Sequence, residues 1–543
     1  WVVRQKQNDS ADYFLGGRDA TWLAIGASIF ASNIGSEHLI GLAGAGASSG
    51  MAMAHWEIQG WMILILGWVF VPFYTRSMVY TMPEFLERRY NPQSRTILSV
   101  ISLVSYVLTK VAVTVYAGGL VFQQVFGIKE LWGIDFFWIA AIGLVVLTAL
   151  YTIFGGMKSV LYTSVLQTPI LLLGSLIILV LGFKELGGWD EMMRVCGAVT
   201  VNDYGDTMTN LIRSNDDANF PWLGALIGSA IIGFWYWCTD QFIVQRVLSG
   251  KNEMEARRGT IFGAYLKLLP VFLFLIPGMI AFALHQKYIG AGGEGFLPML
   301  ANGTANADAA FPTLVAKLLP AGVKGLVVCG ILAALMSSLA SLFNSSAMLF
   351  TIDFYKRFKP ETPEKKLVGI GQIATIVIVV LGILWIPIMR SVGDVLYTYL
   401  QDVQSVLAPG IAAAFLLGIC WKRTSAQGGM WGLISGMVIG LTRLGAKVYY
   451  SNAGEVADST FKYLFYDMNW LFFCGWMFLF CIIVVIVVSL ATEAPTAEKI
   501  QGLVFGTATK KQKAATRASW NHWDIIHTVI ILAITAAFYW YFW

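Results

Sequence analysis

The stretch Ile29–Gly44, IFASNIGSEHLIGLAG, decides the fold because it places polar and ionisable groups inside an apolar run that begins near Trp22. A carboxylate or an amide in hydrocarbon is costly unless it faces a partner or a water-filled cavity. A glycine at such a depth also lets the helix unwind and free its carbonyl groups. The stretch therefore predicts a broken helix that lines a binding site near the bilayer midplane. The alternative is an ordinary kinked helix whose polar groups are capped.

The composition of the whole chain is that of a helical membrane protein. Hydrophobic residues make up 57% of its 543 residues and charged residues only 13%, and the apolar runs are longer than one soluble core can use. The net charge of +5 is small for this length, so nothing indicates a nucleic-acid partner. Five of the six cysteines lie in or next to apolar runs, which argues against a disulfide framework and a cysteine metal site.

Apolar runs of about twenty residues predict an all-α membrane protein with thirteen spans. The predicted spans are 20–48 (broken), 52–75, 97–126, 131–154, 159–183, 219–248, 258–284, 321–352, 367–389, 394–420, 425–444, 468–491 and 523–543. The sequence opens with WVVRQ at residues 1–5, which is typical of the last turn of an apolar segment. We therefore expect one more span before it.

Lysine and arginine gather in alternate connections, and this bias predicts which side faces the cytoplasm. The first span then runs outward and the sixth runs inward, which predicts two five-span repeats of opposite topology, 20–186 and 219–420. No internal repeat is visible by residue identity, so this prediction rests on topology. The expected remaining segments are a cytoplasmic segment 1–19, an extracellular loop 187–218, an outer loop 285–320, two additional spans in 421–491, a cytoplasmic linker 492–522 and a C-terminal span 523–543 that ends outside.

Polar groups inside the predicted spans are candidates for a solute site, because membranes exclude them unless they have a function. Glu57, Lys267, Asn33 and Gln401 supply charged and amide groups, and aromatic rings flank them. Hydroxyl groups need such donors and acceptors, while the apolar face of a sugar ring stacks on tyrosine or tryptophan. The set is therefore what a sugar or another polyol requires. The alternative is that these groups only link one span to another.

A sodium site is also possible on this sequence, since a hard monovalent cation prefers oxygen ligands and a broken helix frees carbonyl groups. Five oxygens would form a cage, from Ala31, Ile34, Ala334, Ser337 and Ser338. The last two would contribute hydroxyl groups and the others carbonyl groups. No phosphate loop or nucleophile-elbow motif occurs in the sequence, so neither ATP-driven transport nor most enzyme chemistries are supported.

Five long motifs resemble the sodium/glucose cotransporters of the solute:sodium symporter family. They are FASNIGSEHLIGLAGAGASSG at 30–50, GWVFVPFYTRSMVYTMPEFLERRY at 67–90, FWYWCTDQFIVQRVLSGKN at 234–252, YLKLLP at 265–270 and LMSSLASLFNSSAMLFTIDFY at 335–355. The resemblance runs through the ten central spans. It implies a LeuT-type fold with a 5+5 inverted repeat, alternating access, and import of a sugar together with Na⁺ across a plasma membrane. We expect a bacterial member, acting in an inner membrane.

The resemblance also implies roles for single residues. The family's sodium ligands fall on the same five positions as the oxygen cage. Its sugar contacts fall on Asn33, His38, Glu57, Tyr236, Trp237, Lys267 and Gln401. Its outer gate falls on Leu42, Trp56 and Tyr397, with Tyr236 as the inner gate. The partners it implies are a small sugar or polyol, sodium and the lipid bilayer, and no obligate protein partner is indicated.

Several positions depart from the family pattern. The segment after Glu57 is one residue shorter than expected, and Gly233 and Thr398 stand where related sugar transporters have threonine and aspartate. Ser164 replaces an aspartate, and because a neutral oxygen holds sodium less well than a carboxylate does, we expect one sodium per solute.

The leading hypothesis for the function is a sodium-coupled symporter of a glucose- or galactose-like hexose. The same machinery acting on myo-inositol or another polyol is the alternative, because the same hydrogen-bonding groups serve both. A sugar-gated sensor or channel is a third hypothesis, and Gln401, where sensor-like members carry glutamate, favours transport over it.

Overall fold

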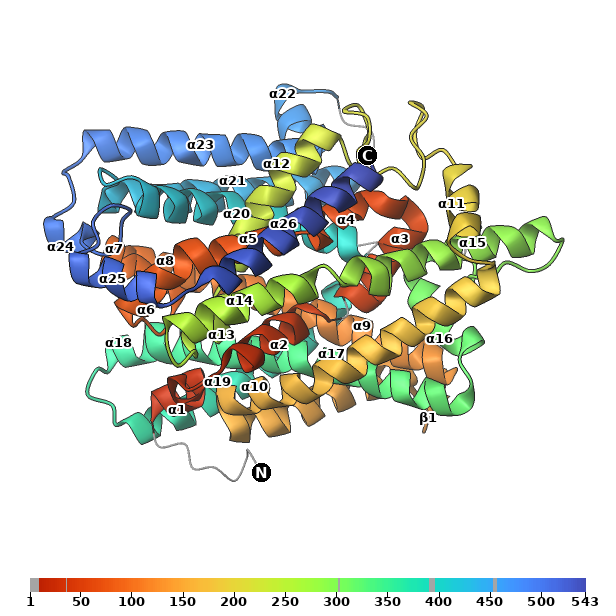
Figure 1. Ribbon diagram of the computed structural model, residues 1–543, viewed down its shortest axis with the longest axis horizontal. Coiled ribbons are helices and arrows are strands. Elements are labelled where there is room, and N and C mark those ends of the chain that lie inside the picture. The colour runs from red at the N-terminus through yellow and green to blue at the C-terminus, as the bar shows by residue number, and fades with distance from the viewer. Residues whose placement is uncertain (1–8, 36, 301–302, 390–395, 453–456) are drawn as a thin grey trace.

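The chain folds into long helices that run side by side, as the computed structural model shows (Figure 1). The structure describes residues 9–35, 37–300, 303–389, 396–452 and 457–543. Within these ranges it does not describe the side chains of 107–109, 124, 385–389, 396–399 and 451–452. The predictions for WVVRQ at 1–5 and for the side chains of Tyr397 and Thr398 therefore lie outside the described part.

The first predicted span is broken, as the polar stretch predicts. Its first half is α2 (Trp22–Asn33), and its second half continues through the π-helical turn η3 (Glu37–Leu42) into α3 (Ala43–Ser49). Between the halves Ile34 is extended, with φ −80° and ψ 102°. A Cβ atom on Gly35 would lie 2.8 Å from Ser338 Oγ, so the break brings the backbone close to the eighth span and needs glycine there.

The sixth predicted span is broken too, although the sequence predicts one continuous segment over 219–248. Helix α12 (Trp222–Gly233) runs through η7 (Phe234–Thr239), the chain extends at Asp240 with φ −75° and ψ 127°, and α13 (Gln241–Leu248) follows. The Asp240 side chain caps α13 by accepting a hydrogen bond from Phe242 N. The first helix of each predicted five-span repeat is therefore the broken one.

The fourth and fifth predicted spans form one helix, α10 (Phe136–Leu186), with a kink at Gly156. Gly156 has φ 54°, and a Cβ atom there would lie 2.5 Å from the carbonyl oxygen of Tyr13. This crowding and the positive φ explain why glycine joins the two spans. The sequence predicts two spans here, 131–154 and 159–183, and the kink at Gly156 lies in the connection between them.

The other predicted spans also appear as helices. The second span comprises α4 (Ala54–Glu57), α5 (Gly60–Ile65), η5 (Leu66–Phe70) and α6 (Val71–Ser77). The third comprises α8 (Pro92–Ser105), η6 (Tyr106–Val111) and α9 (Ala112–Phe126), and the seventh α14 (Glu253–Lys267), η8 (Val271–Leu275) and α15 (Ile276–Gly290). The eighth to thirteenth are α17 (Ala321–Met348) with η10 (Leu349–Tyr355), α19 (Glu364–Met389), α20 (Leu396–Cys420), α21 (Ala426–Asn452), α23 (Trp470–Ala491) and α26 (His522–Tyr541).

Short elements fill the connections, and the two long outer connections each hold a helix. They are α1 (Ser10–Leu15), η2 (Gly16–Arg18), η4 (Gly50–Met53), α7 (Met82–Arg89), β1 (Glu130–Leu131), β2 (Ile134–Asp135), α11 (Trp189–Gly197), η9 (Ala307–Ala309), α16 (Ala310–Leu318), α18 (Lys356–Phe358), α22 (Thr460–Lys462), η11 (Tyr463–Asp467), α24 (Ala497–Ile500) and α25 (Lys510–Ala518). Strands β1 and β2 pair antiparallel.

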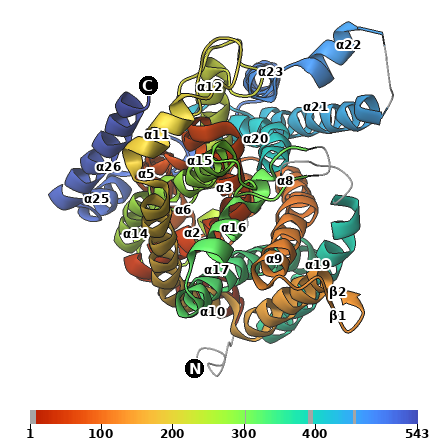
Figure 2. The ribbon, with the colours of Figure 1, turned by 90° about the vertical axis from the view of Figure 1, so that its right-hand side faces the viewer.

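Two strongly basic helices, α18 (Lys356–Phe358) and α25 (Lys510–Ala518), lie at the same end of the bundle, which we call the basic end. Figure 1 shows α1, α18, α24 and α25 at one end and α11 and the β1–β2 hairpin at the other. Figure 2 looks along the bundle from the second end and shows α2, α3 and α17 near its centre, with α26 on the outside against α5 and α14. In the described ranges nine helices are long and apolar enough to cross a membrane.

Candidate functional site

A small cavity of about 40 Å³ lies beside the two helix breaks. Side chains from the first, second, sixth, seventh and tenth spans line it. They are Asn33, Glu37, His38, Trp56, Glu57, Gln59, Ile232, Gly233, Tyr236, Trp237, Lys267, Gln401 and Gln404. All seven residues to which the resemblance gives a sugar contact line this one cavity. Their roles stay a prediction, but their proximity is an observation.

A buried charged cluster forms one wall of the cavity. The Lys267 ammonium donates to Glu57 Oε2 at 2.6 Å, and His38 Nε2 lies 3.2 Å from the same oxygen. The Asn33 amide nitrogen lies 3.3 Å from His38 Nε2. Lys267 and Glu57 are 3% and 1% exposed, so water screens this pair very little. The cluster joins the first, second and seventh spans through hydrogen bonds.

Aromatic rings form the neighbouring walls. The rings of Tyr236 and Trp237 meet edge to face with centroids 4.9 Å apart, and the Lys267 ammonium lies 5.3 Å from the Trp237 ring. Trp56 also lines the cavity and stacks on Trp470 of α23, with centroids 5.5 Å apart. Leu42, the other described member of the predicted outer gate, is fully buried and does not line the cavity.

Three buried polar atoms of the cavity residues have no hydrogen-bond partner in the described part of the chain. They are His38 Nδ1, Trp56 Nε1 and Gln401 Oε1. Because a carboxylate only accepts, His38 Nε2–H donates to Glu57. Trp56 Nε1 can only donate and Gln401 Oε1 can only accept. Buried polar groups of this kind usually find a partner.

A second cluster of oxygens lies where the break of the first span faces α17. The Ser338 hydroxyl lies 3.1 Å from the carbonyl oxygen of Ser32 and 3.2 Å from that of Ile34. Ser337, Ala334 and Ala31 are buried in the same two facing helices. The structure therefore brings together the elements that carry the five predicted sodium ligands. It also adds the Ser32 carbonyl, which the sequence prediction left out.

Ser164 lies beside this oxygen cluster. Its hydroxyl donates to the carbonyl oxygen of Val160 at 2.7 Å and is 3.3 Å from the hydroxyl of Ser337. Thr168, one turn further along α10, donates to the carbonyl oxygen of Ala27 at 3.3 Å. A chain of neutral oxygens thus continues from Ser337 into the fifth span. In the described residues no group of three or more histidine, cysteine, aspartate or glutamate side chains could hold a metal ion.

The set of predicted solute contacts leaves out several residues that line or support the cavity. Glu37, Gln59 and Gln404 line it. Below Tyr236, the buried Lys110 donates to Asp240 Oδ2 at 2.6 Å, and its ammonium lies 4.6 Å from the Tyr236 ring. The lysine was visible in the sequence as an ionisable group within a span, but the pairing with Asp240 requires the second helix break.

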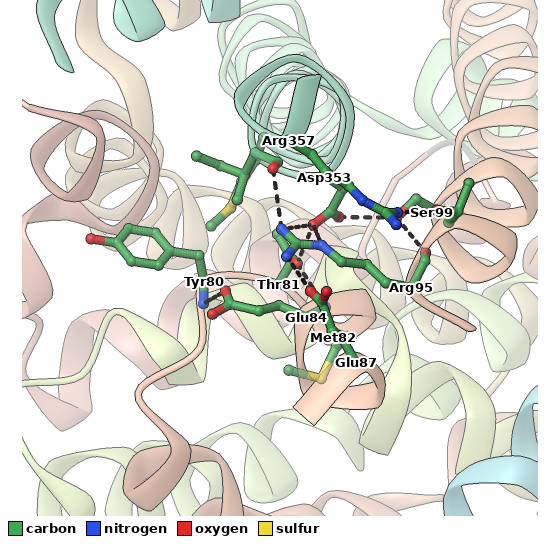
Figure 3. Close-up of polar contacts among 12 residues, drawn as sticks. Tyr80, Thr81, Met82, Glu84, Glu87, Arg95, Ser99, Asp353 and Arg357 are labelled. Carbon is green, nitrogen blue, oxygen red and sulfur yellow. Dashed lines mark hydrogen bonds and ion pairs between the residues drawn. The ribbon is translucent and has the colours of Figure 1, made fainter. Parts of the chain in front are cut away.

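A network of polar side chains fastens the third span to the end of the eighth at the end of the bundle that holds α18 (Figure 3). The buried carboxylate of Asp353 accepts hydrogen bonds from Thr81 Oγ1 at 2.9 Å, Arg95 Nε at 2.7 Å and Ser99 Oγ at 3.1 Å. Arg95 also pairs with Glu87 at 2.5 Å. The N-cap of α7, Thr81, and the helix α8 are therefore both held to η10 by one carboxylate.

The two broken helices and the central polar cavity beside them are typical of a secondary transporter. Comparison with known proteins agrees with this class. The profile of the sodium:solute symporter family matches residues 13–436. The chain therefore belongs to the sodium:solute symporter family, whose transported ion is Na⁺, and it is a transporter and not an enzyme.

Curated relatives cover nearly the whole chain. Human sodium/myo-inositol cotransporter 2 is 36% identical over 519 residues, which are 93% of this chain and 76% of the relative. The sodium/myo-inositol cotransporter of Canis lupus familiaris is 37% identical over 525 residues, with coverages of 92% and 72%. The names give the function of these relatives and not that of this chain.

Solved structures with the LeuT fold resemble the protein. A Na⁺-coupled sialic acid symporter in a substrate-bound outward-open state has a TM-score of 0.71 at 22% identity, over 90% of this chain and 94% of that one. MhsT in complex with L-phenylalanine has a TM-score of 0.50 at 12% identity, over 87% and 99%. At these identities the likeness concerns the fold alone, and it confirms the LeuT-type architecture expected from the sequence.

Proposed function

We propose that the solute carried with sodium is a neutral cyclic polyol of the myo-inositol type. The observation that carries this proposal is the set of unpartnered polar atoms on His38, Trp56 and Gln401 around the cavity. A hydroxyl group both donates and accepts, so a ring that bears hydroxyls on all sides would satisfy the donor on Trp56, the acceptor on Gln401 and the ring nitrogen of His38 at once. The sequence relatives named for myo-inositol transport support the polyol over a glucose-like hexose.

The charged wall suits a neutral solute. Glu57 and Lys267 already neutralise each other at 2.6 Å, so neither is free to compensate the charge of an ionised solute. Neutral hydroxyls can bond to both groups without that cost, and hydrogen bonds to charged groups are stronger than those between neutral ones. The C–H edge of the ring would rest on Trp237 and Tyr236, which supply apolar aromatic surface.

Sodium would bind at the first helix break, through the carbonyl oxygens of Ala31, Ile34 and Ala334 and the hydroxyls of Ser337 and Ser338. This set is a proposal carried over from the sequence, and the distances from Ser338 to the Ile34 and Ser32 carbonyls support it. Because the same broken helix also gives Asn33 to the cavity, an ion that orders the break would pre-organise the solute site. That shared segment is the physical basis we propose for coupling.

Alternating access would use the aromatic side chains on the two sides of the cavity. We propose Trp56, with Leu42 and Tyr397, as the outer gate and Tyr236 as the inner gate. The stacking of Trp56 on Trp470 and the contact of Tyr236 with Lys110 support these roles. We propose that the basic end of the bundle faces the cytoplasm and that the membrane is the plasma membrane.

A competition experiment tests the identity of the solute. The purified protein in proteoliposomes is given labelled myo-inositol with an inward sodium gradient, and unlabelled myo-inositol, glucose or galactose competes. We expect myo-inositol to compete at a concentration at least about tenfold lower than glucose, which corresponds to about 1.4 kcal/mol of preference. Stronger competition by glucose would favour the hexose, the second candidate.

The variant Gln401→Ala tests whether the solute binds in this cavity. Gln401→Ala removes one unpartnered acceptor and should weaken the apparent affinity for the solute by about 5- to 150-fold, because a buried hydrogen-bond partner is lost. Sodium binding without solute should not change. Equal solute affinity in Gln401→Ala and the wild type would contradict the proposal that the solute binds in this cavity.

A further inference from the structure

Gln59 lies in the solute cavity next to Glu57, although the two residues are only two positions apart. On a continuous helix such a pair points in different directions. Here α4 ends at Glu57, and Ile58 (ψ 17°) and Gln59 (ψ 24°) leave the helical conformation before α5 begins at Gly60. This interruption turns both side chains to the cavity.

The carboxamide of Gln59 is held in a defined orientation. Its Nε2 donates to the carbonyl oxygen of Ser229 in α12 at 2.8 Å, and the residue is only 2% exposed. Because a carbonyl oxygen can only accept, this contact identifies which end of the carboxamide is the nitrogen. An amide has a second N–H and an acceptor oxygen, and no hydrogen bond to either occurs in the part of the chain that the structure describes.

Gly233 makes this orientation possible. A Cβ atom at position 233 would lie 2.4 Å from Gln59 Oε1 and 2.9 Å from its Cδ, closer than side chains approach. The carboxamide therefore occupies the space that any side chain at 233 would fill. Both residues line the cavity, so Gln59 takes the place at the cavity wall where a side chain at 233 would otherwise reach the solute.

We propose that Gln59, lying against Gly233, is a specificity-determining residue that recognises one hydroxyl group of the solute. The remaining N–H and Oε1 of the carboxamide form an adjacent donor and acceptor, which match a hydroxyl because it both accepts and donates. A C–H group or a methyl group at that point leaves the carboxamide unpaired. The inference rests on the proposed function. It adds a rule for selectivity: solutes that lack the hydroxyl group facing the sixth span are rejected.

A double-mutant cycle tests the geometry. Gln59→Ala should weaken the apparent affinity for myo-inositol by about 5- to 150-fold, since a buried partner is lost. Gly233→Ala should give a loss of the same order, because its methyl group displaces the carboxamide. In the Gln59→Ala background, Gly233→Ala should add no more than about a twofold change. Fully additive losses would overturn the proposal.

A panel of monodeoxy-inositols tests the recognition itself. In the wild type at least one analogue should bind about 5- to 150-fold more weakly than myo-inositol. In Gln59→Ala the ratio of the affinity for myo-inositol to the affinity for that analogue should fall to about one. A structural role alone would not move this ratio. An unchanged ratio for every analogue would contradict the proposal.

Two controls separate the possible failures. Gly143→Ala in α10, where an added Cβ atom meets nothing within 4 Å, should leave affinity and selectivity unchanged. Sodium binding without solute should be unchanged in Gln59→Ala, which shows that the variant is folded. If the wild type takes up no polyol with sodium, the proposed function fails. If the wild type takes it up and Gln59→Ala keeps both the wild-type affinity and the wild-type selectivity, only the role of Gln59 fails.

Discussion

Replacing Ser338 by alanine should weaken sodium binding before it affects the solute. In the structure the Ser338 hydroxyl lies 3.1 Å and 3.2 Å from the carbonyl oxygens of Ser32 and Ile34, at the break of the first span. Alanine removes one of the five proposed oxygen ligands. An interaction between a polar group and a charge contributes about 1.5–3 kcal/mol, so the sodium affinity should fall by about 10- to 150-fold.

The assay has two parts and one matched control. Radioactive sodium binding is measured without solute, and the sodium dependence of solute uptake is measured in proteoliposomes. Ser346→Ala is the control, because Ser346 lies in the same helix, is fully buried, and its hydroxyl has no partner in the described residues. The reasoning is refuted if Ser338→Ala binds sodium as the wild type does, or if Ser346→Ala weakens binding equally.

Three further predictions concern the inner gate, the stoichiometry and the end of the bundle that holds α18. Tyr236→Phe should keep solute stacking and transport, whereas Tyr236→Ala should abolish transport, as uptake rates will show; equal rates for the wild type and the alanine variant would return Tyr236 to a packing role. With Ser164 the reversal potential should report one sodium per solute, and a shift of that ratio in Ser164→Asp would assign the missing site to this position; a ratio of two in the wild type contradicts this. Arg95→Ala leaves the buried Asp353 carboxylate without its cation and should loosen the network that fastens the third span to the eighth. If this network holds the basic end of the bundle closed, cysteines introduced between the cavity and that end should react faster with water-soluble thiol reagents in the variant. Unchanged reactivity would mean that the network does not hold this end closed.

The first helix break could be predicted from the sequence because Ser32, Asn33, Glu37 and His38 together have no place in hydrocarbon. Asn33, His38, Tyr236 and Trp237 could be named as solute contacts because they lie in long motifs, whereas Glu57 and Gln401 lie outside the quoted motifs and depend on the resemblance of the whole chain. Their position around one cavity follows from the LeuT-type fold, which the resemblance also implied.

The second break was not predicted, because the stretch CTDQ at 238–241 holds no glycine and a single acid, Asp240. Only its pairing with Lys110, a residue 130 positions earlier, compensates the buried charge. Gln59 was missed for a similar reason, since helical spacing turns it away from Glu57 unless the helix is interrupted. The contacts of Asp353 join segments that are more than 250 positions apart, and no local pattern indicates them.

Sodium-driven accumulation of myo-inositol in proteoliposomes tests the central claim most directly. One charge moving through about 100 mV supplies roughly 2.3 kcal/mol and a tenfold sodium gradient adds about 1.4 kcal/mol, so one sodium per solute allows accumulation of up to about 500-fold. We expect uptake against the solute gradient that collapses when potassium replaces sodium. Accumulation that persists without sodium would contradict the account.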